Sequence, residues 1–264
     1  MSINIAAGAA GESLYPDFFA AHQDTPQAFF AWIKVESYPT NGTYYLSAMG
    51  VCANGDTTHS EFVGITNTTT AEARATTNAG GSSGSAKAQI DKVTSAGIWI
   101  PVLAVFDSAG SRTVYVGDVD GATLTGTNPW TRDPVGLTSL MIGSTALNTG
   151  FLRIAQLTRW HGTLPTATDF EKLKYGAPPE SIAVAGLTDQ FKADSDWGAS
   201  DIPNAVGAKA IAPNAVWTYS ADNPVIKTPT LTLDAIPTEI RAGEEFTVRV
   251  TYDNAPTIEP TATV

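Results

Sequence analysis

The stretch Ile98-Trp-Ile-Pro-Val-Leu-Ala-Val-Phe-Asp107 is the most strongly patterned segment of the chain, with apolar residues at every even position from Ile98 to Phe106. Successive side chains of a β-strand point to opposite faces, so the pattern predicts a strand whose even positions share one face. The turn formers of residues 108–111 and a second strand-like segment at 112–118 follow, which predicts a hairpin. Pro101 cannot donate to a ladder, and we expect it at an edge or a bulge.

Working outward, most of the chain divides into short apolar segments separated by turn formers. Residues 29–35 and 44–51 flank a turn at 38–42 and are predicted to pair as a hairpin. Residues 76–86 are rich in Gly, Ser and Thr with no apolar period to bury, and they are predicted to be loop. Further strands are predicted at 61–69, 140–143 and 151–160.

One helix is predicted. Thr168-Asp-Phe-Glu171 fits a capping box, Lys172 and Lys174 lie near the end, and Gly176 followed by two prolines stops the segment. Because this helix is short and isolated among strands, the sequence predicts an all-β protein with one accessory helix.

Composition excludes several function classes. The chain has 264 residues, a net charge of −11 and one cysteine, Cys52, so no disulfide forms within it. No cluster of Lys and Arg is present, which argues against a nucleic-acid partner. No apolar run approaches the ~20 residues of a membrane helix, and residues 1–33 contain no Lys or Arg, so we expect neither membrane insertion nor a secretory signal.

Several motifs then follow in a recognisable order. Residues 30–34 (Phe-Ala-Trp-Ile-Lys), 99–107, 112–118 (Arg-Thr-Val-Tyr-Val-Gly-Asp) and 150–160 are followed by a closing segment that ends in Asp222-Asn-Pro-Val225. Over residues 14–226 this series resembles laminin G-like, concanavalin A-type jelly-roll domains of the kind found in bacteriophage virion proteins. The resemblance implies a concanavalin A-like jelly-roll sandwich of two antiparallel sheets.

Lys227-Thr-Pro229 marks a boundary between residues 1–226, the jelly-roll domain, and residues 227–264. Beyond it, residues 231–234 and 245–252 alternate as in the opening strands of an immunoglobulin-like sandwich. Such sandwiches use about seven strands, so we expect this Ig-like extension to be incomplete. We expect it to dock on a neighbouring chain or on the jelly roll, because open sheet edges favour pairing.

No catalytic constellation stands out, and the chain is predicted not to be an enzyme. Glycosidases of the concanavalin fold place Glu-x-Asp-x-x-Glu on one strand, and this chain has no Glu-x-Asp. Gly80-Gly-Ser-Ser-Gly84 matches a nucleophile elbow formally, but polar residues precede it where the elbow needs a buried strand. His22, His59 and His161 are scattered, without metal-site spacing.

Two groups of residues are candidate sites. Acidic turns offer the oxygen ligands that calcium prefers, with a solvated turn as the alternative: Asp118, Asp120, Asp194, Asp196 and Asp201. Aromatic residues outside the motifs are candidates for stacking on sugar rings, with packing as the alternative: Trp130, Trp197, Tyr44 and Tyr45. Trp32, Trp99 and Trp160 lie at positions that the resemblance assigns to the core.

The resemblance and the missing catalytic groups together favour a structural protein of a bacteriophage virion, a decoration protein on the particle surface. The alternative is a lectin-like module of a tail fibre or spike that binds a host surface glycan, and a polysaccharide-degrading enzyme is a third. The expected partners are other virion proteins and further copies of this chain. The virion is the expected location, with assembly in the host bacterial cytoplasm, and calcium is the one cofactor candidate.

Overall fold

The computed structural model describes fifteen segments of the chain. They are residues 2–5, 13–21, 26–38, 44–54, 56–67, 70–108, 110–117, 123–128, 134–143, 152–192, 200–213, 217–222, 224, 230–233 and 250–253. Among these residues no helix is long and apolar enough to cross a membrane.

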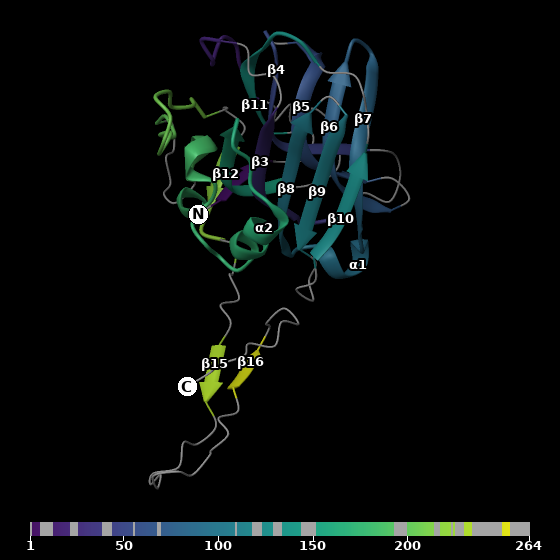
Figure 1. Ribbon diagram of the computed structural model, residues 1–264, viewed down its shortest axis with the longest axis vertical. Helices are drawn as coiled ribbons and strands as arrows, with labels where there is room; N and C mark the ends of the chain where they lie inside the picture. Colours follow the sequence, from purple (N-terminus) through teal and green to yellow (C-terminus); the bar gives the residue numbers. More distant parts are fainter. Residues whose placement is uncertain are drawn as a thin grey trace, which may run out of the picture.

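Two antiparallel sheets form the body of the protein (Figure 1). In the described residues, the first sheet has eight strands. In spatial order they are β10 (Thr123–Asn128), β9 (Ser111–Gly117), β8 (Trp99–Ser108), β3 (Gln27–Val35), β12 (Leu152–His161), β1 (Ser2–Ile5) and β14 (Trp217–Ser220), with β13 (Leu187–Phe191) also paired to β12. The second sheet has six: β2 (Ser13–Tyr15), β11 (Leu137–Ile142), β4 (Tyr44–Ala53), β5 (Asp56–Asn67), β6 (Ala71–Ala79) and β7 (Ser82–Ile90).

The main hydrophobic core lies between the two sheets. Ile100, Val102, Ala104 and Phe106 of β8 all belong to it, which confirms the face predicted from the alternation in this strand. Ile98 lies before β8 and is 44% exposed. The predicted β8–β9 hairpin is confirmed, with Val102 opposite Val116. The predicted all-β, two-sheet jelly-roll sandwich is therefore confirmed.

The predicted hairpin between residues 29–35 and 44–51 is wrong. β3 lies in the eight-stranded sheet between β8 and β12, whereas β4 lies in the six-stranded sheet between β11 and β5. β3 and β4 are both apolar enough to be buried, so their local sequence pattern fits pairing with each other as well as placement in opposite sheets. In a sandwich, consecutive strands can belong to opposite sheets, and only the tertiary packing decides it.

The predicted loop at residues 76–86 is also wrong, because this segment contains most of a hairpin. β6 and β7 pair along their whole length, from Ala71 opposite Ile90 to Ala79 opposite Ser82. Gly80 and Gly81 form the two-residue turn with φ of 57° and 81°. Positive φ at both positions suits the turns that match the twist of a hairpin, and glycine adopts it without strain.

The prediction that Pro101 lies at an edge or a bulge is wrong, because β8 is an inner strand and its register with β3 is continuous at Pro101. It lies in β8, between β3 and β9, opposite Trp32 of β3. The ladder with β9 begins only at the next residue, Val102, so Pro101 stands just beyond the paired segment on that side. Gly117 lies beside the ring, and a Cβ there would be 2.9 Å from Pro101 Cγ.

The helix predicted from residue 168 is present but begins earlier. α2 (Ala167–Lys174) has Thr166 as its N-cap, and Thr166 and Asp169 form the capping box. Both Thr166-x-x-Asp169 and Thr168-x-x-Glu171 fit the sequence pattern of a capping box. Glu171 does not cap the helix and forms an ion pair with Lys174 Nζ at 2.8 Å. A second short helix, α1 (Lys92–Ser95), and two 3₁₀ turns, η1 (Pro179–Ser181) and η2 (Val184–Gly186), were not predicted.

The outer face of the eight-stranded sheet is covered near its centre. Phe170 and Leu173 of α2 are buried in a second cluster with Trp32 and Trp160, whose burial confirms the core role expected for these two tryptophans. Phe170 stacks on Tyr115 of β9, with 5.8 Å between the ring centroids. Helix α2 therefore covers the centre of the outer face of the eight-stranded sheet. The outer face of the six-stranded sheet is the remaining candidate for a binding surface.

A buried polar network joins the two sheets at one end of the sandwich. Glu61 of β5 and Thr77 of β6 face Gln27 of β3 and Arg112 of β9, and none of the four is more than 1% exposed. The Glu61 carboxylate accepts hydrogen bonds from Gln27 Nε2 at 2.6 Å and Thr77 Oγ1 at 3.2 Å, and Arg112 Nε donates to Thr77 Oγ1. Buried charges need such partners, because desolvation is costly.

Arg159 of β12 extends this network. Its guanidinium donates from Nε and Nη2 to Gln27 Oε1, at 3.2 Å each, and from Nη1 to Asp189 Oδ2 at 3.1 Å. The same group lies over the ring of Phe19, 4.5 Å from its centroid. Burial lowers the pKa of Arg159, and the Asp189 carboxylate opposes that shift.

Two strands lie beyond the sandwich in the sequence. β15 (Thr230–Leu233) and β16 (Val250–Asp253) pair antiparallel with each other, and among the described residues neither pairs with a strand of the sandwich. They overlap the segments 231–234 and 245–252 that were expected to be Ig-like strands. The other residues of that extension lie outside the described part of the chain.

We predict that Glu61→Ala lowers the free energy of unfolding by about 3–5 kcal/mol, because it removes the anion that Gln27, Thr77 and the neighbouring arginines surround. Urea denaturation of the full chain measures this. Gln89→Ala, at an exposed position of β7, is the control and should change stability by less than about 0.5 kcal/mol. A loss below about 1 kcal/mol for Glu61→Ala would show that the network is not needed for stability.

Candidate functional site

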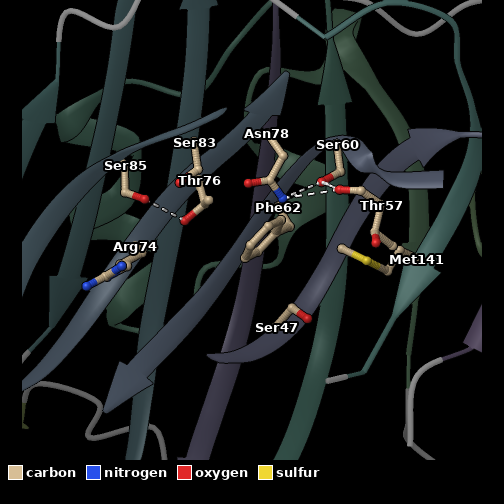
Figure 2. A pocket seen from close by; sticks show the side chains of 10 residues that line it. All are labelled: Ser47, Thr57, Ser60, Phe62, Arg74, Thr76, Asn78, Ser83, Ser85 and Met141. Carbon is tan, nitrogen blue, oxygen red and sulfur yellow. Dashed lines mark hydrogen bonds between the residues drawn. The ribbon is translucent and has the colours of Figure 1, made fainter. Parts of the chain in front are cut away.

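The outer face of the six-stranded sheet carries a hollow of about 250 Å³. It lies opposite the core, since its residues alternate along the strands with core residues such as Val63, Ala75 and Ala86. Figure 2 shows the ten side chains that line it: Ser47, Thr57, Ser60, Phe62, Arg74, Thr76, Asn78, Ser83, Ser85 and Met141. We call this hollow the sheet groove.

One row of residues crosses the sheet at the centre of the sheet groove. Met141 is opposite Gly50, Gly50 opposite Phe62, Phe62 opposite Thr76, and Thr76 opposite Ser85. The row runs over five strands, which corresponds to about 19 Å at the usual strand spacing. Phe62 is half-buried and is the single aromatic ring in the described lining.

Gly50 is the position in this row where close approach requires glycine. A Cβ at residue 50 would lie 2.4 Å from Phe62 Cβ and 2.4 Å from the Glu61 carbonyl oxygen. Because Gly50 has no side chain, β4 and β5 can pair there, and the floor of the groove is recessed between Met141 and Phe62. Glycine within a strand often marks such a close backbone approach.

A second row, formed by Ser60, Asn78 and Ser83, bounds one side of the groove. Asn78 Nδ2 donates to the Thr57 carbonyl at 3.2 Å and to Ser60 Oγ at 3.0 Å (Figure 2). Because a carbonyl only accepts, these bonds fix the amide with its Oδ1 directed away from Thr57. No hydrogen bond among the described residues uses Asn78 Oδ1 or the exposed Ser83 hydroxyl.

An irregularity in β5 shapes that end of the groove. Cys52 is opposite Ser60 but Ala53 is opposite Asp56, so residues 57–59 bulge out of the ladder between β5 and β4. Thr58 donates from Oγ1 and from its backbone N–H to the Asp56 carboxylate, each at 2.8 Å, and these bonds hold the pKa of Asp56 below its usual range. Bulges of this kind commonly re-aim side chains beside binding sites.

Hydroxyl groups give the groove its chemistry. Thr76 Oγ1 and Ser85 Oγ are 3.0 Å apart, and one donates to the other. Each hydroxyl carries one proton and two lone pairs, so the pair retains a proton and several lone pairs for a ligand. Together with the Asn78 amide oxygen, the groove can both donate and accept hydrogen bonds close to an aromatic face.

One cation, Arg74, is present in the described lining, on the other side of the central row from Asn78. Arg74 of β6 donates from Nε to Glu72 Oε2 at 3.0 Å and from Nη2 to the same oxygen. Lys87 of β7 lies 3.9 Å from that oxygen. The two cations and one carboxylate form a compact charged group beside the hydroxyl-lined part.

The structure places few of the residues that were predicted as sites. Asp201 is exposed, and in the described part of the chain no three His, Cys, Asp or Glu residues gather as a metal site would require. Tyr44 and Tyr45 begin β4, and their side chains lie outside the described residues. The remaining candidates lie wholly outside them: Asp118, Asp120, Asp194, Asp196, Trp130 and Trp197. The calcium and stacking hypotheses for these residues stay predictions.

Asp222, from the closing motif, has a structural role. Its carboxylate accepts hydrogen bonds from Lys34 Nζ at 2.6 Å, Arg153 Nη1 at 2.8 Å and Trp99 Nε1 at 3.2 Å. Burial works against the charged form, but the bonds from Lys34 and Trp99 outweigh it, and the pKa of Asp222 is lowered. Trp99 is only half-buried, held by this bond and by the second cluster.

Residues 80–84 do not form a nucleophile elbow, because the turn joins two strands and no helix follows. This confirms that the motif match is only formal.

The residues of the sheet groove were not predicted, because half of them lie in or beside the segment taken for a loop. A signal was present in the sequence. Alanine recurs at every second position in 71–75 and again at 86 and 88, with polar residues between. This is the two-residue period of a strand, but alanine contributes little apolar area, so the period is weak on any hydrophobicity scale.

Comparison with known proteins gives similarities in structure alone. No family model matches the chain, and no curated protein matches it in sequence. Tailspike protein 2 of the Escherichia coli O157:H7 bacteriophage CAB120 is similar over 72% of this chain, with 11% identity and a TM-score of 0.46. The binding domain of botulinum neurotoxin serotype G covers 61% at 14% identity and a TM-score of 0.42.

A heptameric SAP-like pentraxin from Limulus polyphemus covers 65% of this chain and 81% of its own, with 16% identity and a TM-score of 0.41. The chain spans only 26% of the tailspike and 37% of the neurotoxin chain. Because each of these TM-scores is below 0.5, no conclusion about function follows from them. The laminin G-like assignment stays a prediction from the sequence motifs.

We predict that Gly50→Ala destabilises the protein by about 1–3 kcal/mol, because the added Cβ meets the backbone of β5 and Phe62 Cβ, neither of which can move freely. Thermal or urea unfolding measures the change. Gly110→Ala is the matched control: nothing lies within 4 Å of its Cβ position, so its stability should stay within about 0.5 kcal/mol of wild type. Equal effects of the two substitutions would contradict the close approach at Gly50.

Proposed function

We propose that this protein is a non-catalytic saccharide-binding module of a bacteriophage particle, and that the sheet groove holds the sugar chain. The observation that carries the proposal is the position of Phe62. Its half-buried side chain is opposite Thr76 of the Thr76–Ser85 hydroxyl pair and one row from Asn78, on the outer face of the sheet. Few other ligand classes use both an apolar face and a dense set of hydroxyl groups.

The chemistry of the groove matches a pyranose ring. The C–H side of such a ring is apolar and packs on an aromatic face, while its hydroxyls donate and accept hydrogen bonds. The groove supplies both hydrogen-bond donors and acceptors for these hydroxyls, because the Ser83 hydroxyl donates or accepts and Asn78 Oδ1 accepts. A row about 19 Å long, crossing five strands, suits several linked sugars better than one.

The absence of paired acids in the groove favours binding over hydrolysis. Glycosidases use two carboxylates about 5–9.5 Å apart. None of the described lining residues is Asp or Glu, and the nearby Glu72 carboxylate is held by Arg74 and Lys87. We therefore propose that the groove binds saccharides without cleaving them, in preference to a polysaccharide-degrading enzyme.

The particle context comes from the sequence motifs, which resemble jelly-roll domains of bacteriophage virion proteins. In that setting the ligand is a glycan of the host surface, and many copies of the module on one particle would raise avidity without any new contact. Weak single-site affinity is sufficient under these conditions.

A second candidate function is a decoration protein of the particle, and β15 and β16 favour it. A two-stranded sheet by itself is only marginally stable in water, so we expect β15 and β16 to pack on the surface of another protein. Other virion proteins or further copies of this chain are the partners that we propose for them. The two functions are compatible, because the groove and these strands belong to different parts of the chain.

Phe62→Ala is expected to weaken binding of an oligosaccharide by about tenfold or more, since it removes the apolar face that the ring supplies. A glycan array identifies the ligand, and calorimetry measures the affinity of the wild type and the variant. Val93→Ala is the control, because Val93 is 87% exposed on α1, outside the groove lining. Absence of saccharide binding by the folded wild type, or equal binding by Phe62→Ala, would contradict the proposal.

The decoration hypothesis predicts that a chain ending at residue 226 loses attachment to the particle. Purified particles lacking the protein would be mixed with the full chain or the shortened chain and then sedimented. We expect the full chain alone to sediment with the particles. Equal attachment of both chains would show that residues 227–264 are not the docking element.

A further inference from the structure

The charged group at one end of the sheet groove bears on which saccharides can enter. Arg74 is only 8% exposed, and it is the one cation in the described lining. A buried guanidinium beside hydroxyl groups is the usual means by which a protein holds a carboxylate or a sulfate. Here, however, a carboxylate of the same strand already binds it.

Glu72 and Arg74 stand two residues apart on β6, so their side chains share the outer face of the sheet. Arg74 directs both Nε and Nη2 to Glu72 Oε2. The Glu72 side chain is 20% exposed, which lowers the screening of the pair by water. An anionic ligand that bound the Nε–Nη2 edge of Arg74 would have to displace Glu72 and then lie beside the displaced carboxylate.

Displacement is unfavourable for two reasons. The carboxylate of Glu72 would be left partly buried without its two charge-assisted hydrogen bonds, which is costly. The whole chain also carries a net charge of −11, so its field repels a polyanionic glycan at a distance. Lys87 adds a positive charge near Glu72, but it is 49% exposed and 3.9 Å away, so its effect is screened.

We propose that the sheet groove selects uncharged saccharides, and that Glu72 determines this selectivity by keeping Arg74 occupied. This inference rests on the proposed saccharide-binding function and names the ligand class of the same site. An uncharged sugar satisfies the hydroxyls of Thr76, Ser83 and Ser85 and leaves the Glu72–Arg74 pair intact. Uronic acid, sialic acid and sulfated sugars meet a site whose cation is already neutralised.

The test uses the full chain and two sets of hexasaccharides: neutral hexoses, and uronic acid oligomers with the same linkages. Calorimetry at constant ionic strength measures the affinity of each set for the wild type. We expect the wild type to bind the best neutral hexasaccharide about tenfold or more tightly than its uronic acid counterpart. Tighter binding of the uronic acid oligomer by the wild type would overturn the inference.

Glu72→Gln removes the carboxylate that holds Nε and Nη2 of Arg74, and we expect it to reduce or reverse this preference by strengthening uronic acid binding about tenfold. Glu36→Gln is the matched control. It removes one negative charge at an ion pair with Arg153, away from the groove lining, and should leave the preference unchanged. The double variant Glu72→Gln/Arg74→Gln should lose the gain, since the cation is then absent.

The outcomes separate the two proposals. If no saccharide of either kind binds the folded wild type, the proposed function fails. If saccharides bind but Glu72→Gln leaves the preference unchanged, or if the gain survives in the double variant, only the role of Glu72 fails. Thermal unfolding of every variant confirms that each comparison is made on folded protein.

Discussion

The buried carboxylate of Glu61 is the constraint on which the binding face depends. It lies between the sheets, bonded to Gln27 across the sandwich and to Thr77 on the neighbouring strand. Glu61 and Thr77 are directly opposite each other in the β5–β6 ladder, and the next pair is Phe62 opposite Thr76. A slip of one residue in either strand would expel a buried charge from its partners and turn Phe62 or Thr76 into the core. The same bonds that hold the two sheets together therefore set the register of the groove.

The two sheets are not equivalent. The eight-stranded sheet is buried on both faces where α2 packs, and its strands β3 and β8 are accordingly apolar on both sides. The six-stranded sheet buries one face and carries hydroxyl and amide groups on the other. Small residues make this possible: alanines fill the inner face of β6 and β7, and Gly50 lets β5 approach β4. The location of the groove follows from which sheet the helix covers.

The charged side chains also differ between the interior of the sandwich and the outer face of the six-stranded sheet. Two buried arginines serve the interior: Arg112 bonds to Thr77 of the opposite sheet, and Arg159 bonds to Gln27 and Asp189 of its own sheet. Arg74 lies on the outer face, but Glu72 neutralises it locally. A groove lined by hydroxyls, with its one described cation occupied, is suited to ligands that hydrogen-bond without bringing charge. Specificity of this kind depends on an intramolecular pair as much as on any contact with the ligand.

Local pattern was sufficient for the β class, for the faces of β8, for the β8–β9 hairpin and for the presence of α2, because each depends on side chains that are neighbours in the sequence. Partner strands were not predictable in the same way. Phe29 to Val35 is equally suited to pairing with β4 or with β8 and β12, and the choice is made by contacts between residues more than 60 positions apart. The groove was missed for a related reason. The Ala and Gly content of residues 71–86 is too weakly apolar to indicate burial, and only the sheet packed against it makes these small residues core. The sequence by itself thus determined the β class and which side of β8 faces inward. Tertiary structure decided which strands meet and which outer face carries the groove, because burial is a property of the assembled layers.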